Sequence, residues 1–203
     1  MALVSPEQGL GAHFAGTVMA AYAAVGYPQA PPSEYHHFPG AFTEDWLDRI
    51  PSPTDTSGIV TLADHGKATR LTPDLVGDAY ALKPRTQIHS EFHEPWLRIA
   101  SHNLAHWLGH KVIIKAFESV PEDKTFGRHR DALPVVVVQA KGEKAWYLGE
   151  AARDTQADPT VMMRRGDMMI VPADYWHDVR TLSGRSVHFS IGMCLDRPLN
   201  RAD

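Results

Sequence analysis

Three side chains in the second half of the chain could converge on one metal ion. His129 and Asp131 are two positions apart, and His177 follows much later in the sequence. In extended backbone, residues two apart point to the same face, so His129 and Asp131 can reach one point. Two imidazoles and one carboxylate on one side of a metal form the facial triad of non-haem Fe(II) oxygenases, which leaves three coordination positions open. The H-x-D spacing also occurs by chance, and each residue alone is more typical of a surface or hydrogen-bonded group.

The composition argues against several other classes of protein. The chain has 203 residues, with 20 Lys and Arg, 24 Asp and Glu, 12 His and one Cys. A formal net charge of −4 without a long basic run argues against nucleic-acid binding, because phosphate contacts need clustered cations. One cysteine excludes a disulfide framework and a zinc site built on several thiolates. No apolar run approaches the roughly 20 residues of a membrane helix, and no signal peptide is evident, so we expect a cytoplasmic protein without a membrane partner.

The elements that must position these residues change in character near residue 110. Before it, capping and proline signals predict helices over residues 44–50, from 73 onwards and over 95–108, with one short strand at 59–62. After it, apolar runs between turns predict strands over residues 111–118, 135–138, 144–148, 168–171, 178–181 and 186–193. The turn at Lys141 and Gly142 predicts a hairpin. We expect one α+β, mainly β domain over residues 1–203, with a mainly helical part (1–110) that contributes some β structure and a jelly-roll core (111–203).

Two longer segments surround the candidate metal ligands. Residues 126–148 (FGRHRDALPVVVVQAKGEKAWYL) carry H-x-D, an apolar strand, a turn, Lys144 fifteen positions after His129, and then Trp146. Residues 166–193 (GDMMIVPADYWHDVRTLSGRSVHFSIGM) carry a Gly-Asp turn, an apolar strand, proline, aromatic residues and the distal His177. Both segments resemble the JmjC-type, cupin-like 2-oxoglutarate oxygenases, the ribosomal oxygenases more than the asparaginyl hydroxylases. The first 85 residues show no recognisable match.

The resemblance implies an enzyme on a double-stranded β-helix that uses Fe(II), 2-oxoglutarate and O2 to hydroxylate an amino-acid side chain in a protein or peptide. It implies that His129, Asp131 and His177 are the iron ligands and catalytic residues. It also implies that Lys144 binds the far carboxylate of 2-oxoglutarate, a charge-assisted contact that suits a dianionic cosubstrate. A peptide natural product or a free amino acid would also suit a chain of this length, and a homodimer stays open.

The last predicted strand carries two further candidates. His188 and Ser190 alternate with Val187, Phe189 and Ile191, so one face of this strand is polar. That face could point to solvent or line a pocket. The resemblance favours the pocket, where His188 or Ser190 would contact the cosubstrate or a metal-bound water.

Two other functions fit the same residues. A cupin-type dioxygenase or isomerase could use the metal without 2-oxoglutarate, and Lys144 would then be a solvated lysine at a turn. A non-catalytic metal-binding protein of the same fold is the third reading, although nothing in the triad looks altered. Indifference of turnover to substitution of Lys144 would favour the cupin.

Three other histidines, in and just after the helix predicted over residues 95–108, have the spacing of a single helical face. They are His102, His106 and His110, spaced i, i+4 and i+8. The leucines of this helix cluster on the opposite side, so the histidine face is predicted to be a solvated polar face. A second metal site there is the less favoured interpretation.

Overall fold

The computed structural model describes residues 5–27, 32–50, 60–64, 66–83, 85–89, 94–121, 123, 125–149 and 160–198. Within them lie the helices α1 (Pro6–Ala24), α2 (Glu44–Leu47), α3 (Pro73–Leu82) and α4 (Pro95–Leu108). The strands are β1 (His36–Phe38), β2 (Val60–Asp64), β3 (Lys67–Leu71), β4 (Thr86–His89), β5 (His110–Ser119), β6 (Val135–Lys141), β7 (Lys144–Gly149), β8 (Val161–Met163), β9 (Met168–Val171), β10 (Trp176–Thr181) and β11 (Ser186–Pro198). No helix in these ranges is long and apolar enough to cross a membrane.

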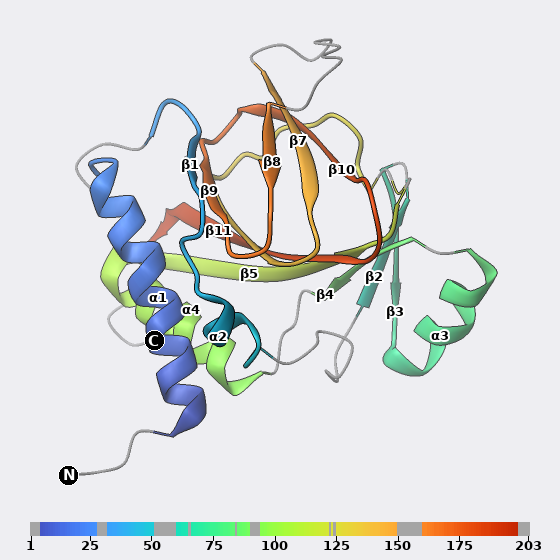
Figure 1. Ribbon diagram of the computed structural model, residues 1–203, viewed down its shortest axis with the longest axis horizontal. Helices are drawn as coiled ribbons and strands as arrows, with labels where there is room; N and C mark the ends of the chain where they lie inside the picture. The colour runs from blue at the N-terminus through green and yellow to red at the C-terminus, as the bar shows by residue number, and fades with distance from the viewer. Residues whose placement is uncertain are drawn as a thin grey trace.

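The strands form two sheets that face each other (Figure 1). The larger sheet has eight strands in the order β1-β9-β6-β11-β5-β4-β2-β3, and the smaller has three in the order β10-β7-β8. Every pair of neighbours is antiparallel, and β11 lies between β5 and β6. This is a jelly roll with helices from the N-terminal part packed on it. The predicted mainly β double-stranded β-helix with a helical N-terminal region is therefore confirmed.

Strand β5 forms a wall between the hydrophobic core and the space enclosed by the sheets. Side chains alternate between the two faces of a strand. One face of β5 carries Val112, Ile114 and Ala116, which are buried in the core cluster. The other face carries the residues that line a cavity: Ile113, Lys115, Phe117 and Ser119. The same alternation on β11 turns His188 and Ser190 toward the cavity.

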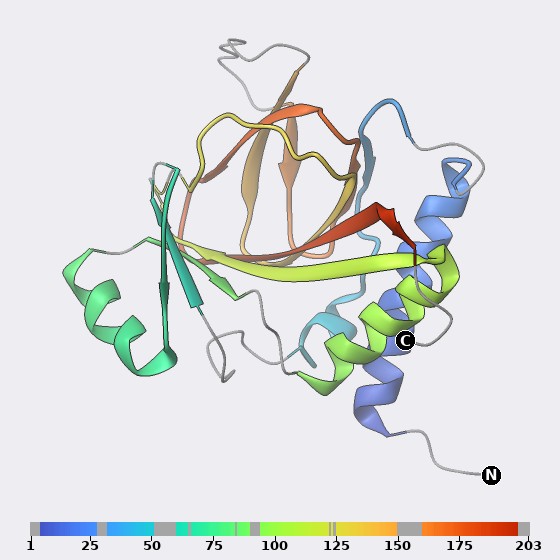
Figure 2. The same cartoon turned by 180° about the vertical axis from the view of Figure 1, so that it is seen from behind.

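Helices α1 and α4 lie against each other on the outer side of the larger sheet (Figure 2). The rings of Phe14 and Trp96 both pack edge-on against Phe189 of β11, with centroids 6.0 and 5.7 Å from it. Gly11 allows this close packing of the helices, because a Cβ there would lie 2.4 Å from the carbonyl oxygen of Trp96. The two helices thus support the larger sheet, whose strands β5, β6 and β11 line the cavity.

The predicted helices are present, although the structure adds one. Helix α2 ends earlier than predicted, and α4 ends at Gly109 with φ 71°, the left-handed cap that the sequence predicted. Helix α1 was not predicted. It begins with a capping box in which Ser5 and Gln8 each accept a backbone N–H of the other.

The hairpin predicted at Lys141 and Gly142 is wrong. Strand β6 pairs with β9 and β11 in the larger sheet, whereas β7 pairs with β8 and β10 in the smaller one. The chain therefore crosses between the sheets at this turn. Gly142 has φ 63°, and a Cβ on it would lie 2.6 Å from the Arg185 carbonyl oxygen, so the crossing needs glycine. This crossing places Lys144 on the smaller sheet.

The part before residue 110 contributes more β structure than the single strand predicted there. Strands β1, β2, β3 and β4 all join the larger sheet. Strand β1 has three half-buried residues, and β3 is almost fully exposed. Neither shows the alternation of buried and exposed residues that marks a strand in a sequence.

Candidate functional site

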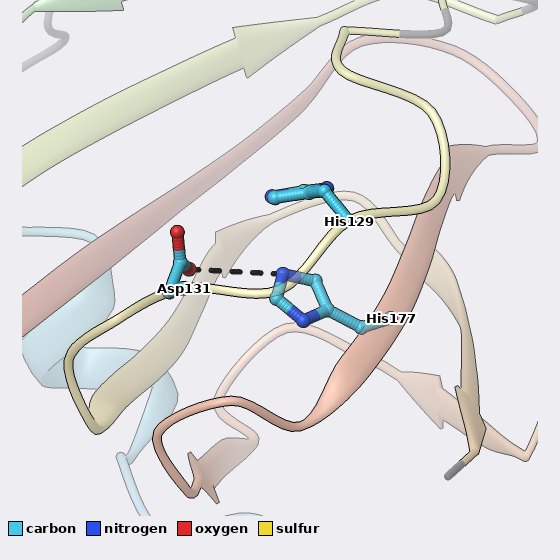
Figure 3. Close-up of side chains that lie close together, drawn as sticks. All are labelled: His129, Asp131 and His177. Carbon is cyan, nitrogen blue, oxygen red and sulfur yellow. Dashed lines mark ion pairs between the residues drawn. The ribbon is translucent and has the colours of Figure 1, made fainter. Parts of the chain in front are cut away.

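His129, Asp131 and His177 come together at one end of the space between the sheets (Figure 3). The backbone N–H of His129 donates to the His177 carbonyl at 2.9 Å, and the reverse hydrogen bond measures 2.8 Å. His177 Nε2 lies 3.7 Å from Asp131 Oδ2. One ligand atom from each of the three side chains lies within 4.8 Å of the other two. Among the described residues, this is the only group of three or more His, Cys, Asp or Glu side chains so arranged.

Backbone carbonyls fix the proton of each imidazole on the nitrogen that faces away from the group. His129 Nδ1 lies 2.8 Å from the Gly127 carbonyl oxygen, and His177 Nδ1 lies 3.0 Å from that of Tyr175. A carbonyl oxygen only accepts, so both Nδ1 atoms donate, and the neutral tautomer of each ring that fits this contact has its lone pair on Nε2. Burial, followed by the nearby His129, lowers the pKa of His177 and favours its neutral form. Neutral imidazoles with free Nε2 lone pairs are metal ligands.

The loop before His177 is tied to the loop that carries Asp131. The backbone N–H of Asp174 donates to the Asp131 carbonyl at 2.7 Å. Asp174 has φ 60°, a left-handed conformation that Asp and Asn tolerate better than most side chains. The Arg130 side chain pairs with the Asp174 carboxylate at 3.6 Å and lies over the Trp176 ring at 5.4 Å. These contacts hold the two loops in register.

The three donors fit a divalent first-row transition metal. Two imidazole nitrogens and one carboxylate oxygen, set on one side of the ion, leave positions for other ligands. The His177 side chain is buried, whereas that of Asp131 is 44% exposed, so the group is accessible from one direction. A metal held here would lie between the cavity and solvent.

The cavity beside this group has a volume of about 460 Å³, within the range of small-molecule sites. Its walls are largely apolar, and Phe117 of β5 and Trp146 of β7 both approach His188, with ring centroids 4.8 and 6.1 Å from it. Polar lining residues gather around Lys144, which pairs with Thr181 four positions along β10 from His177. Ser119 and His188 contact Lys144, and Asp123 and Thr125 are linked to Ser119 through Thr86.

Lys144 is a buried cation among these polar residues. Its Nζ donates to Ser119 Oγ at 2.9 Å and lies 2.8 Å from His188 Nδ1. An ammonium only donates, so His188 accepts at Nδ1 and carries its own proton on Nε2. Burial lowers the pKa of Lys144 to about 7, and the charge of Asp123 opposes that shift. Burial and the Lys144 charge hold the pKa of His188 well below its ordinary value, so His188 is neutral.

A family model for the JmjC domain matches residues 90–200, which is more than half of the chain. The chain belongs to the JmjC domain family. This confirms the family resemblance inferred from the two long segments.

Structures of the ribosomal oxygenase YcfD from Escherichia coli share the fold of this JmjC domain. One matches with a TM-score of 0.57 and 19% identity, over 83% of this chain and 49% of that chain. Another, in complex with cobalt and 2-oxoglutarate, matches with a TM-score of 0.56 and 17% identity, over 91% and 52%. The chain thus spans about half the length of YcfD. No curated protein sequence matches it.

All six residues singled out in the sequence line one cavity of this JmjC domain. They are His129, Asp131, Lys144, His177, His188 and Ser190. Their location together agrees with the prediction, and their chemical roles stay predictions. Five polar lining residues were missed: Lys115, Ser119, Asp123, Thr125 and Thr181. Ser119 could have been found, because it continues the cavity face of β5 two positions after Phe117. Lys115 lies on the same face of β5, and Thr181 shares the face of β10 that carries His177 and Val179, so alternation could have found both. Asp123 and Thr125 lie after β5 and follow no local pattern.

The second histidine group does not form a metal site in the described part of the chain. His102 and His106 are exposed on α4, as the solvated-face interpretation predicts. The placement of His110 on the same helical face is wrong, because the chain leaves the helix at Gly109 and His110 is the half-buried first residue of β5. Neither His102 nor His106 belongs to a group of three potential ligand side chains among the residues described.

Proposed function

We propose that this JmjC domain is an Fe(II)- and 2-oxoglutarate-dependent oxygenase that hydroxylates an amino-acid side chain in a protein or peptide. One observation carries the proposal. A three-donor group with free Nε2 lone pairs and a buried lysine line the same cavity. The group suits an Fe(II) ion, and the lysine suits the far end of a dianionic keto acid.

In this proposal, His129 Nε2, His177 Nε2 and the Asp131 carboxylate hold the iron. Together with 2-oxoglutarate, bound Fe(II) supplies the activation of O2 for attack on an unactivated C–H bond. The protein keeps both imidazoles oriented through the carbonyls of Gly127 and Tyr175. The Asp131 carboxylate offsets part of the metal charge.

Lys144 would hold the far carboxylate of 2-oxoglutarate. Within the described residues, two of its three N–H groups are directed to Ser119 and His188, which leaves the third for a ligand. His188 Nε2–H would be a second donor, and Ser190, on the same face of β11, a third. The Trp146 and Phe117 rings limit access of water to this contact and so strengthen it.

The substrate would enter on the side where Asp131 is exposed. Phe126 is exposed there beside His129, with ring centroids 5.4 Å apart, and offers an apolar contact. YcfD is described as a ribosomal oxygenase, which supports a protein substrate for this chain as well.

Anaerobic titration calorimetry of 2-oxoglutarate with Mn(II) in place of Fe(II) tests the proposal. We expect binding that weakens about 10- to 100-fold in Lys144→Met, the usual cost of a lost charge-assisted hydrogen bond. Lys115→Met is the matched control, because Lys115 lines the same cavity but is exposed and lies on the opposite sheet. The proposal is contradicted if the wild type does not bind 2-oxoglutarate. It is also contradicted if Lys115→Met weakens binding and Lys144→Met does not. Turnover and succinate release that are indifferent to substitution of Lys144 favour a cupin that does not use 2-oxoglutarate.

A further inference from the structure

A series of hydrogen bonds runs from Lys144 to an acidic residue. Lys144 Nζ donates to Ser119 Oγ at 2.9 Å, and Ser119 Oγ is hydrogen-bonded to Thr86 Oγ1 at 3.1 Å. Thr86 Oγ1 is also hydrogen-bonded to the Asp123 carboxylate and, at 2.6 Å, to Thr125 Oγ1. These residues come from β7, β5, β4 and the loop after β5. The fold, rather than a local turn, brings them together.

The acidic residue draws the proton of Thr86. Thr86 Oγ1 is the donor toward both Ser119 Oγ and the Asp123 carboxylate, and its one proton is drawn to the carboxylate, which only accepts. Ser119 Oγ accepts from Lys144 Nζ. The hydroxyl groups thus connect Lys144 to one carboxylate, and the negative charge of Asp123 favours the ammonium at position 144 over the neutral amine.

We propose that Asp123 is a positioning residue that acts through Thr86 and Ser119 to keep Lys144 charged and directed at the cosubstrate carboxylate. The identity of the ligand rests on the proposed function, whereas the effect of Asp123 on Lys144 is inferred from the hydrogen bonds. It extends the binding site to Thr86, a fully buried residue of β4 that does not line the cavity. Cosubstrate affinity then depends on Asp123 near neutral pH.

The charges around Lys144 agree with this role. Among the described residues, the titratable groups that face it are His188 from β11 and Asp123 from the loop after β5. The flanking strands β8 and β10 pair with it at Met163 and Thr181, which are uncharged. His188 is neutral, so Asp123 is the one charge in this set that favours the ammonium. Because burial brings the pKa of Lys144 to about 7, loss of that charge removes ammonium at physiological pH.

Asp123 also has an opposite effect, since its charge repels the carboxylate of the cosubstrate. At pH 6 the lysine is mostly charged in the wild type and about half charged in a variant with a midpoint one unit lower, so the lost ammonium weakens binding by only about twofold and the relieved repulsion offsets that loss. Above the pKa of Lys144, the loss of ammonium dominates. Asp123→Asn is therefore expected to bind 2-oxoglutarate as well as or better than the wild type at pH 6, and about tenfold more weakly at pH 8.

Two measurements test this on the full chain. The first follows the ¹³Cε resonance of Lys144 through a pH titration of protein without metal or cosubstrate, assigned by its loss in Lys144→Met. The second is the Mn(II)-supported 2-oxoglutarate titration at pH 6, 7 and 8. The variants are Asp123→Asn, Thr86→Val, which breaks the series while keeping the acid, and Asp78→Asn, an exposed residue of α3 that makes the same charge change elsewhere.

We expect the Lys144 midpoint to fall by about one pH unit in Asp123→Asn, by less in Thr86→Val, and not at all in Asp78→Asn. An unchanged midpoint in Asp123→Asn, or affinities that fall equally at pH 6 and pH 8, overturns the inference. If Asp123→Asn does not fold, an unchanged midpoint in Thr86→Val overturns it. A wild type that binds no 2-oxoglutarate contradicts the proposed function instead, while the resonance of Lys144 still tests the role of Asp123.

Discussion

The backbones of His129 and His177 are joined by two hydrogen bonds of 2.9 and 2.8 Å in an isolated antiparallel bridge. The two imidazoles therefore start from neighbouring points of the backbone, with ring centroids 4.3 Å apart. Because the bridge involves only backbone atoms, it exists before any metal binds. The metal-binding group is preorganised by the fold.

This preorganisation separates metal binding from folding. We expect His129→Ala to weaken Mn(II) binding by about a hundredfold or more, since one of three protein ligands is lost. The melting temperature of the metal-free protein should change little, because the backbone bridge is kept. Electron paramagnetic resonance of free Mn(II) measures the affinity. His106→Ala, on the exposed face of α4, should bind like the wild type, and equal losses in both variants would contradict the assignment.

The turn before His177 offers a second test. The Asp174 N–H holds the Asp131 carbonyl at 2.7 Å, from a residue with φ 60°. Proline has no N–H and cannot adopt this φ, so Asp174→Pro should weaken Mn(II) binding at least about tenfold. Asp174→Gly keeps both the N–H and the conformation and should retain affinity. If Asp174→Gly loses as much Mn(II) affinity as Asp174→Pro, the side chain of Asp174 and not its backbone N–H holds Asp131.

Substitution by alanine should change the stability of the protein in opposite directions at two glycines of α1. A Cβ at Gly11 would meet the Trp96 carbonyl oxygen at 2.4 Å, so Gly11→Ala should destabilise the protein by about 1–3 kcal/mol. Gly9 has no atom within 4 Å of such a Cβ, and Gly9→Ala should stabilise the helix by about 0.5–1 kcal/mol. Urea unfolding of the two variants measures both free energies. Equal effects would mean that α1 and α4 do not pack at this distance.

The buried Lys144 ammonium should lower the free energy of unfolding, although the site needs this charge for binding. Its pKa is 10.5 in the unfolded chain and about 7 in the fold, so between these values the unfolded state binds more protons. The free energy of unfolding therefore rises with pH across this window. Lys144→Met should be more stable than the wild type by about 1–3 kcal/mol at pH 7, with a smaller gap at pH 9.

Urea unfolding at both pH values measures the gap. Lys141→Met, an exposed control at the start of the same turn, should not differ from the wild type at either pH. A Lys144 variant that is less stable at pH 7 would show that the ammonium is better compensated than its burial indicates.

The metal-binding group could be predicted from sequence because its spacing has a simple geometric meaning. His129 and Asp131 share a face of extended backbone, and Lys144 stands at a fixed offset from His129 in a recognisable segment. The alternation of Val187, His188, Phe189 and Ser190 likewise reflects a strand with one apolar and one polar face. Such periodic patterns survive in the fold because burial of one face enforces them.

What the sequence could not predict depends on which strands become neighbours. Gly142 looks like a hairpin glycine, yet the strands on either side of it belong to different sheets. Thr86 and Asp123 approach Lys144 only because β4 pairs with β5, with Ile88 opposite Phe117. No local pattern encodes such a register, so these residues gave no signal.

One measurement tests the central claim most directly. A crystal structure grown without oxygen, with Mn(II) and the 2-oxoglutarate analogue N-oxalylglycine, shows the metal ligands and the anchoring cation together. We expect His129 Nε2, His177 Nε2 and an Asp131 oxygen on the ion, and the far carboxylate of the analogue on Lys144 Nζ. An ion bound by other side chains, or a carboxylate held by Lys115 with Lys144 left aside, would contradict the account.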